Sequence, residues 1–319
     1  MICDEGHALK NSKSIIHKKL STISTKKRVV LTGTPLQNNL TEFYNIVNFT
    51  NPGILESEES FRTTFAKPIE GGMTKDSSDK EVQTMKETLC ILTNYLKKCL
   101  NRKDQLTLQP FLASKIEFDI AITLSQTQVD LYKDCVMGMK REGRRCMRDH
   151  KKLLNIWNHP LPHLRSIVTE GCEPESPESQ GTKLSFLLSF AKAIVDHGEK
   201  LLVFTQSRVS LDLIEEFFAS KHGWTKGEHY LRMDGTTCLT DRKKGVARFN
   251  DENNKTCSVY LITSKTGGQG LNITAANRVI IYDISWNPTV DIQAIYRSYR
   301  LGQTRNVYIY RILAKGISE

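Results

Sequence analysis

The sequence predicts an α/β protein with a mostly parallel β-sheet, organised in two domains. Beyond residue 181, short β-branched runs alternate with amphipathic patterns at helical spacing, as in successive βαβ units. A further strand, loop and helix follow one another between residues 27 and 53. The length of 319 residues exceeds the roughly 150 residues of an average domain, which favours two separate cores.

The composition argues against fibrous, disordered and membrane-spanning proteins. Hydrophobic residues make up 39% and charged residues 25%, as in ordinary globular proteins. No apolar run approaches the roughly 20 residues of a membrane helix, and Asp4 and Glu5 stand where a signal peptide needs apolar residues, so we expect no membrane partner. The net charge of +10 instead favours a polyanionic partner.

The cysteines predict neither a metal site nor a disulfide framework. There are eight of them, and no two approach C-x-x-C spacing. We therefore expect reduced thiols in an intracellular protein.

Residues 1–53 are expected to form part of a first domain. Val29, Val30 and Leu31 predict a short buried strand that ends at Thr32-Gly33-Thr34-Pro35. Apolar residues at positions 36, 40, 43 and 47 then follow helical spacing, and Asn51-Pro52-Gly53 ends that helix. Residues 54–110 contain a polar insert at 71–79 and a helical pattern at 89–100, which predicts an accessory helical protrusion.

Residues 111–181 are expected to form a linker and a helical insertion. The stretch 170–181 is acidic, rich in proline and without apolar periodicity, as in a linker or exposed loop. The segment 140–152 carries seven Lys or Arg against two acids. It either contacts a phosphate backbone or forms a solvated helix face, and both interpretations are open from the sequence.

Residues 182–319 are expected to form a complete second domain. Strands and helices alternate here, so the sheet should be mostly parallel with helices on both faces. The expected elements are a helix from 183, strands at 201–205, 230–233, 259–263, 278–283 and 307–313, and helices at 207–220, 240–250 and 289–301.

The tetrapeptide Asp4-Glu5-Gly6-His7 places two adjacent carboxylates where a strand would end. In a nucleotide hydrolase the first carboxylate can hold Mg²⁺ and the second can orient the attacking water. Taken alone, adjacent acids are more often a solvated turn.

The segment 30–39 is a strand that runs into a hydroxyl-rich loop containing Thr32, Gly33 and Thr34. Such a loop could relay changes between a nucleotide site and a moving domain, although Thr, Gly and Pro also simply end strands. Its position after the acidic tetrapeptide favours the relay.

The segment 264–272 is a glycine-rich loop directly after a predicted strand. Its glycines would let backbone N–H groups approach a phosphate, and Ser264 and Thr266 would add hydroxyl donors. A plain turn between a strand and a helix is an equal alternative for this segment alone. It is not a P-loop, because G-x-x-x-x-G-K-[ST] occurs nowhere in the 319 residues.

The segment 291–304 pairs a glutamine with two arginines. If it is helical after Pro288, Gln293, Arg297 and Arg300 fall at positions i, i+4 and i+7 on one face. Two arginines aimed together can act as arginine fingers on a transferring phosphoryl group. A surface helix with scattered basic groups is the alternative for either arginine alone.

Taken in order, these segments resemble the Swi/Snf-type family of helicase-related, DNA-translocating ATPases. Asp4-Glu5-Gly6-His7 resembles motif II, residues 31–39 motif III, and residues 202–206 motif IV, with 232–237 similar to the strand that follows it. Residues 264–272 with Trp286-Asn287-Pro288 resemble motif V, and residues 293–303 resemble motif VI. The stretch 223–316 is most similar to the ATRX-type branch of the family.

The resemblance implies two RecA-like lobes, the first incomplete and the second complete, with accessory helical insertions. Proteins of this type clamp ATP and Mg²⁺ and move along double-stranded DNA in the nucleus, in chromatin remodelling or DNA repair, so duplex DNA and nucleosomes are the implied partners. The resemblance assigns catalysis to Asp4, Glu5, Arg297 and Arg300, with Asp4 also holding Mg²⁺. It assigns coupling to the ATP site to His7, Thr32, Gly33, Thr34 and Gln293, and nucleic-acid binding to Ser264, Thr266, Gly267, Gly268, Gly270 and Asn272.

The missing P-loop is the main departure from the family pattern. In the family this loop precedes motif II by roughly a hundred residues or more, so the resemblance implies a piece of a longer ATPase that begins inside the first lobe. Positioning of the nucleotide supplies most of phosphoryl-transfer catalysis, so we expect the chain alone to be inactive.

Two other functions are open at this point. One is a nucleotide-independent DNA- or protein-binding module derived from such an ATPase. The other is an RNA helicase, which the spacing of motif VI and Trp286-Asn287-Pro288 disfavour.

Overall fold

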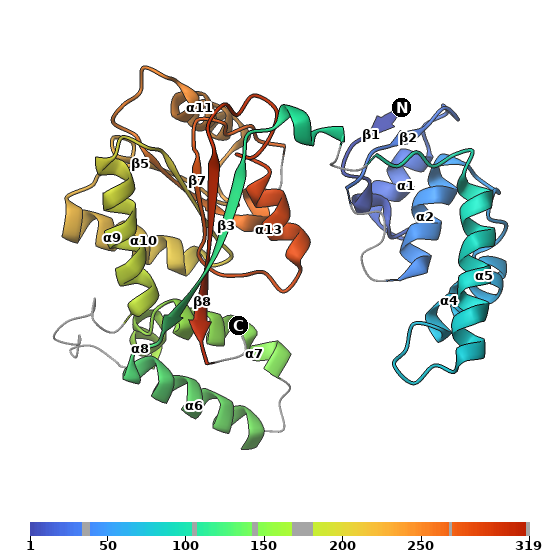
Figure 1. Cartoon of the computed structure of the whole chain (residues 1–319), viewed down its shortest axis with the longest axis horizontal. Coiled ribbons are helices and arrows are strands. Elements are labelled where there is room, and N and C mark those ends of the chain that lie inside the picture. The colour runs from blue at the N-terminus through green and yellow to red at the C-terminus, as the bar shows by residue number, and fades with distance from the viewer. Residues whose placement is uncertain (34–38, 104–106, 142–145, 168–180, 268–269, 317–319) are drawn as a thin grey trace. The chain divides into compact units, whose positions relative to one another are not determined.

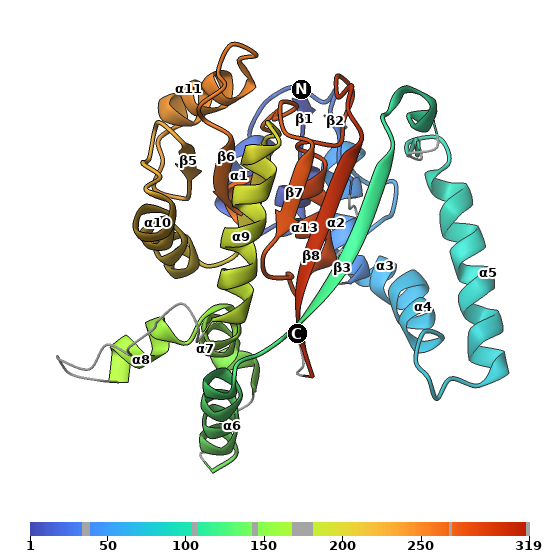
Figure 2. The same ribbon diagram turned by 60° about the vertical axis from the view of Figure 1, so that its left-hand side comes forward.

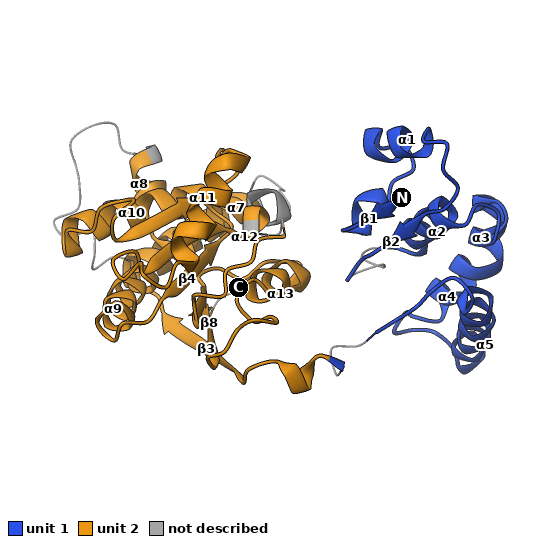
Figure 3. Ribbon diagram, turned by 90° about the horizontal axis from the view of Figure 1, so that it is seen from above, with its two compact units in different colours: residues 1–107 blue, residues 108–319 orange. Residues whose placement is uncertain are grey.

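The computed structural model describes the chain except for residues 34–38, 104–106, 142–145, 168–180, 268–269 and 317–319. The chain divides into two compact units, Met1–Thr107 and Leu108–Glu319, coloured separately in Figure 3. Each unit has hydrophobic core residues of its own.

Unit 1 combines a small parallel sheet with a set of helices (Figure 1). Strands β1 (Ile2–Cys3) and β2 (Val29–Val30) pair in parallel, with Ile2 opposite Val29 and Cys3 opposite Val30. The strand expected at 29–31 is confirmed over Val29–Val30, but its expected burial is wrong, because Val29 and Leu31 are 51% and 52% exposed. The helical elements of unit 1 are η1 (Gly6–Leu9), α1 (Ile15–Ser21), α2 (Leu40–Thr50), α3 (Glu58–Phe61), the π-helical turn η2 (Arg62–Ala66), α4 (Lys67–Gly71) and α5 (Asp79–Leu96).

Side-chain caps determine where α2 and α5 begin. The Asn39 side chain accepts a hydrogen bond from the Glu42 amide at 2.9 Å, so α2 begins at Leu40. Position 36 of the expected apolar stripe lies outside the described residues. Ser78 and Glu81 form a capping box that starts α5 at Asp79, well before the periodic pattern at 89–100. Apolar side chains from both helices then share the core of unit 1.

Unit 2 contains a six-stranded sheet in the order β3-β8-β7-β4-β6-β5 (Figure 2). Every pairing in it is parallel, which confirms the expected parallel α/β sheet. Its strands are β3 (Lys115–Thr123), β4 (Leu201–Thr205), β5 (Tyr230–Met233), β6 (Val259–Thr263), β7 (Arg278–Ile281) and β8 (Val307–Lys315).

Helices cover both faces of this sheet. On β4, Leu201 and Val203 pack with α9 and α10, whereas Leu202 and Phe204 belong to the opposite core with residues of α11 and α13. Burial on both faces is expected for a central parallel strand. The helical elements of unit 2 are η4 (Gln109–Phe111), α6 (Gln126–Arg141), α7 (Cys146–Asn158), α8 (Leu161–Ile167), α9 (Thr182–Asp196), α10 (Arg208–His222), α11 (Leu239–Asn250), α12 (Ser264–Gly267) and α13 (Pro288–Ile295).

The helix expected at 289–301 is shorter than predicted. Helix α13 ends at Ile295, so Arg297 and Arg300 are not on its face. The chain turns away because tertiary hydrogen bonds replace helical ones: the Arg297 carbonyl accepts from the Ile273 amide at 3.0 Å, and the Ser298 hydroxyl donates to the Ala276 carbonyl. The prediction that Arg297 and Arg300 share a helical face with Gln293 was therefore wrong.

Strand β3 was not expected, because residues 111–181 were assigned to a linker and helices. It pairs with β8 along its whole length, from Lys115 opposite Val307 to Thr123 opposite Lys315. As an edge strand it leaves most side chains exposed, so it lacks the apolar run that identified the central strands. Among the described residues, no helix is both long and apolar enough to cross a membrane.

Candidate functional site

In unit 1, the two expected motifs lie at neighbouring strand ends. Asp4 and Glu5 follow β1, while Thr32 and Gly33 follow β2, and the two strands are parallel partners. The Leu31 amide donates to the Cys3 carbonyl at 2.8 Å, and the Gly6 amide donates to the Leu31 carbonyl at 2.9 Å. Carboxyl ends of parallel strands meet at one edge of a sheet, where α/β proteins place ligands. Thr34 lies outside the described residues.

Gly6 is required by this close approach. A Cβ atom at Gly6 would lie 2.0 Å from Cγ1 of Val30, a distance that no side chain tolerates. The glycine therefore lets the turn after β1 pack directly on β2.

Glu5 has a left-handed backbone conformation with φ of 53°. Its backbone amide donates to Oδ1 of Asp4 at 2.8 Å, which holds the Asp4 carboxylate against the turn after β1. Oε2 of Glu5 lies 3.2 Å from Nδ1 of His7, an ion pair when the imidazole is protonated. Non-glycine residues with positive φ are uncommon, and Glu56, with φ of 59°, is the other one among the described residues.

In unit 2, the glycine-rich segment begins as a single helical turn, α12, rather than as an open loop. Ser264 and Thr266 are both buried, and the Thr266 hydroxyl accepts from the Thr263 hydroxyl at 2.8 Å. The expected hydroxyl donors to phosphate therefore point into the protein. Gly270 has φ of 62° and is exposed, and the Asn272 carbonyl accepts from Asn250 Nδ2 at 2.7 Å. Gly268 lies outside the described residues.

Arg297 and Arg300, from the segment that resembles motif VI, contact the end of the glycine-rich segment 264–272. Nη1 of Arg297 lies 3.5 Å and Nη1 of Arg300 lies 3.4 Å from the carbonyl oxygen of Leu271. The Gln303 amide nitrogen anchors the same region by donating to the carbonyls of Thr274 and Ala276 at 2.9 and 2.8 Å. Gln293 is half-buried on α13. The two arginines thus converge through tertiary packing, although the expected helical face does not exist.

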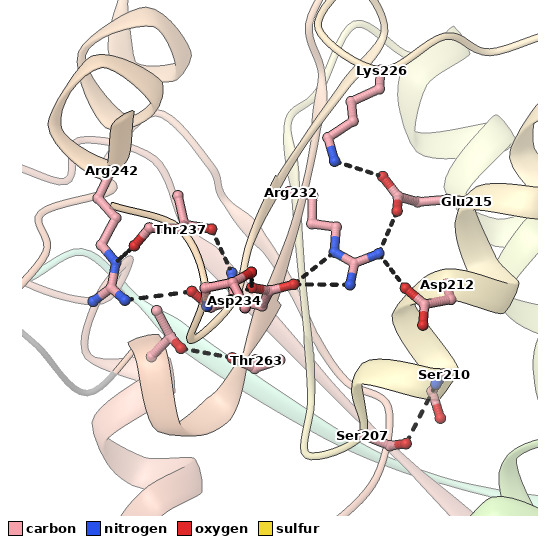
Figure 4. A network of polar contacts seen from close by, with 12 residues as sticks. Ser207, Ser210, Asp212, Glu215, Lys226, Arg232, Asp234, Thr237, Arg242 and Thr263 are labelled. Atoms are coloured by element: carbon pink, nitrogen blue, oxygen red, sulfur yellow. Dashed lines mark hydrogen bonds and ion pairs between the residues drawn. The ribbon is translucent and has the colours of Figure 1, made fainter. Parts of the chain in front are cut away.

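A charged cluster at β5 fixes the loop that follows this strand (Figure 4). Arg232 pairs with Asp212 and Glu215 of α10 and, at 2.8 Å, with Asp234. Burial acts to raise the pKa of Asp234, but hydrogen bonds from Thr236 and the pairing with Arg232 outweigh it and hold that pKa well below its usual range.

A buried carboxylate at the end of β7 was missed by the sequence analysis. Asp283 is fully buried; its Oδ1 accepts from the Gln206 amide at 2.7 Å, and its Oδ2 accepts from Thr205 Oγ1 at 2.5 Å and Asn158 Nδ2 at 2.8 Å. Burial raises its pKa, and these hydrogen bonds and the charge of Lys183 oppose the rise. The available signal was a lone acid directly after the apolar run 279–282.

Comparison with known proteins identifies the family. Residues 1–167 match the SNF2-related domain, and residues 182–302 match the helicase conserved C-terminal domain. The chain belongs to the SNF2-related family. The resemblance to Swi/Snf-type ATPases is thereby confirmed, as is the α/β fold class of RecA-like lobes.

Curated relatives of this SNF2-related chain are longer proteins. It is 30% identical to human "Transcriptional regulator ATRX" over an alignment that covers all of this chain and 18% of that protein. It is 34% identical to "Protein CHROMATIN REMODELING 20" of Arabidopsis thaliana, covering 26% of it, and 34% identical to "DNA repair and recombination protein RAD54-like" of Drosophila willistoni, covering 43%. The chain therefore spans less than half the length of these relatives.

Solved structures show the same fold. The Sulfolobus solfataricus SWI2/SNF2 ATPase core, solved in complex with dsDNA, matches with a TM-score of 0.52 and 26% identity, over 99% of this chain and 63% of that one. The C-terminal part of the Fun30 ATPase domain matches with a TM-score of 0.52 over 64% of this chain and 87% of that one. At 22% identity the second match bears on the fold alone.

Proposed function

We propose that this SNF2-related chain is the motor region of an ATP-dependent translocase on double-stranded DNA, acting on chromatin or in DNA repair in the nucleus. The observation that carries the proposal is the pairing of motifs within each unit. Asp4-Glu5 and Thr32-Gly33 end neighbouring parallel strands, and Arg297 and Arg300 converge on the glycine-rich segment at Leu271. The names of the relatives support the cellular role, and nucleosomes are the proposed substrate.

The carboxylates at the end of β1 suit Mg²⁺ and ATP. Asp4 is exposed and offers the hard oxygen ligands that Mg²⁺ prefers. Bound Mg²⁺ would neutralise charge on the nucleotide phosphates. Glu5 would orient the attacking water, and Arg297 and Arg300 would stabilise the charge of the transferring phosphoryl group. The proposed coupling residues are His7, Thr32, Gly33, Thr34 and Gln293.

The glycine-rich segment would hold DNA through its backbone. Because the side chains of Ser264 and Thr266 are buried, the contacts would come from amides around Gly267, Gly268 and Gly270, with Asn272 beside them. Backbone amides read phosphates and not bases, which suits a protein that moves along DNA.

The test is ATP hydrolysis by a version of the chain that also carries a P-loop-bearing segment from a RAD54-like relative. Duplex DNA should stimulate turnover, Glu5→Gln should abolish it, and Glu58→Gln, a change at an exposed glutamate of α3, should have no effect. Duplex binding without any DNA-stimulated hydrolysis would contradict the motor and favour a nucleotide-independent binding module.

A further inference from the structure

The switch point of the unit 2 sheet is filled by the protein's own side chains. Strands β4 and β7 are neighbours, and the helices that follow them, α10 and α13, contribute to opposite cores. Open α/β sheets usually receive a ligand at such a point, beyond the carboxyl ends of the two strands. Here Thr205 of β4 and Asn158 of α7 both donate a hydrogen bond to Asp283, which follows β7.

Asn158 reaches this point because α6 and α7 present it in a fixed position. The Gln128 amide nitrogen of α6 donates to the carbonyls of Ile156 and Trp157 at 2.8 and 3.0 Å, which holds the last turn of α7. The Asn158 carbonyl accepts from the Tyr282 hydroxyl at 3.0 Å, and its Nδ2 also donates to Ser210 Oγ at 3.0 Å. The side chain is 2% exposed, so it is locked between α7, α10 and β7.

Asp283 in turn fixes the loop 284–287. It holds the Gln206 amide, and the Gln206 side chain donates to the Ile284 carbonyl at 2.7 Å. At the other end, the Ser285 amide donates to Asp291 at 2.9 Å and Asn287 caps α13. Between these anchors Trp286 is 77% exposed, so the loop presents an indole from a rigid base.

We propose that Asn158 and Asp283 are a positioning pair that sets the conformation of the loop 284–287 and so couples the helices α6 and α7 to Trp286. A displacement of α7 would reach the loop through one hydrogen bond and the carboxylate that anchors it. This inference depends on the proposed function in one respect: it assigns the loop 284–287 to the working part of the motor.

Fluorine NMR of the full chain labelled with fluorotryptophan tests the pair. The chain has three tryptophans, and the resonance of Trp286 is assigned by its loss in Trp286→Phe. In Asn158→Ala and in Asp283→Asn, the Trp286 resonance should move toward the position of unfolded tryptophan and sharpen. Trp224, which packs in the core of α10 and β5, should keep its dispersed resonance and so report an intact fold.

Asn155→Ala is the matched control, because Asn155 lies on the same helix and accepts from Ser207 at 3.0 Å without touching Asp283. It should leave the Trp286 resonance in place. The exchange Asn158→Asp with Asp283→Asn restores a donor facing an acceptor, so it should return part of the shift.

An unchanged Trp286 resonance in Asn158→Ala, with Trp224 dispersed, would overturn the pair, as would an equal shift in Asn155→Ala. If Asp283→Asn unfolds, as a loss of Trp224 dispersion would show, Thr205→Val removes one donor with little change of shape and must shift Trp286 alone. Failure of DNA-stimulated hydrolysis would count against the proposed function and leave this signal untouched.

Discussion

Arg297 and Arg300 share one acceptor, because Nη1 of each lies within 3.5 Å of the carbonyl oxygen of Leu271. Arg297 is buried, and its own carbonyl is held by the amide of Ile273 at 3.0 Å. The last motif is therefore attached to the end of the glycine-rich segment by side chains and backbone together. Two planar guanidinium groups on one oxygen form a donor cluster that suits an oxygen-rich anion such as phosphate.

Removing either arginine should abolish turnover in the P-loop-bearing version. We expect Arg297→Ala and Arg300→Ala to lower hydrolysis by about a thousandfold or more while ATP binding stays largely intact, because arginine fingers act on transition-state charge. Steady-state turnover and binding of an ATP analogue measure the two effects. Arg305→Ala is the control, since Arg305 donates to the Ala275 carbonyl in the same region without sharing Leu271. Near-normal turnover in both finger variants would show that motif VI was misread as catalytic.

Residues 1–319 alone should not hydrolyse ATP measurably. No P-loop pattern occurs in these residues, so nothing in them supplies the lysine and glycine cradle that positions the β- and γ-phosphates. Phosphate release with saturating duplex DNA is the measurement, and Glu5→Gln gives the background from contaminants. DNA-stimulated turnover that Glu5→Gln removes would contradict this prediction.

The substitution Gly6→Ala should push apart the ends of strands β1 and β2 in unit 1. Gly6→Ala places Cβ against Val30, and we expect a loss of about 1 to 3 kcal/mol in the local opening free energy. Amide hydrogen exchange at Leu31, whose N–H is bonded to Cys3, reports it. Gly71→Ala is the matched control, because a Cβ there meets no atom within 4 Å. If the Leu31 amide is equally protected from exchange in Gly6→Ala and Gly71→Ala, the close approach of position 6 to Val30 is not required.

The contribution of Asp234 to the free energy of unfolding should be lost in acid. Its pKa is lower in the folded than in the unfolded chain, so its contribution is present above the unfolded pKa of about 3.9 and is lost as pH falls below it. Asp234→Asn should lower the free energy of unfolding by about 2 kcal/mol at neutral pH and by less near pH 3. Urea unfolding at several pH values measures the difference.

Asp212→Asn is the control for this pH series. Asp212 pairs with the same arginine, but its side chain is 63% exposed, so we expect a change below about 0.5 kcal/mol. The raised pKa of Asp283 has the opposite effect on stability, yet it is common to both variants and cancels in the comparison. If Asp234→Asn lowers the free energy of unfolding by the same amount at every pH, the shifted pKa of this carboxyl does not govern stability.

Elements whose burial leaves a periodic signal could be predicted from the sequence. Features that depend on contacts between residues distant in the chain could not. Strands β4 and β6 were predicted with their observed bounds, because a central parallel strand is apolar on both faces. The end of α13 depends on hydrogen bonds to residues 273–276, which no local pattern reveals. The bond between Asn158 and Asp283 joins residues 125 positions apart, so neither residue could be paired from spacing.

Binding to DNA should be electrostatic and independent of sequence. The net charge of +10 favours a polyanion, and the proposed contacts come from backbone amides around Gly267 and Gly270, which cannot read bases. Affinity for two duplexes of unrelated sequence should therefore agree. It should fall steeply with salt, because log K declines by about 0.9 per neutralised phosphate for each unit of log salt. A total slope of only about 1 would mean too few phosphate contacts for a protein that tracks along DNA.

The choice of nucleic acid separates a DNA translocase from an RNA helicase. In the P-loop-bearing version, duplex DNA should stimulate hydrolysis far more than single-stranded RNA does, since the proposed contacts follow the phosphate backbone of a DNA duplex. Both nucleic acids are titrated against turnover at one salt concentration, because the electrostatic part of binding otherwise obscures the comparison. Arg300→Ala serves as the control for stimulation that does not pass through the proposed site. Equal or greater stimulation by RNA would overturn the translocase and favour the RNA helicase.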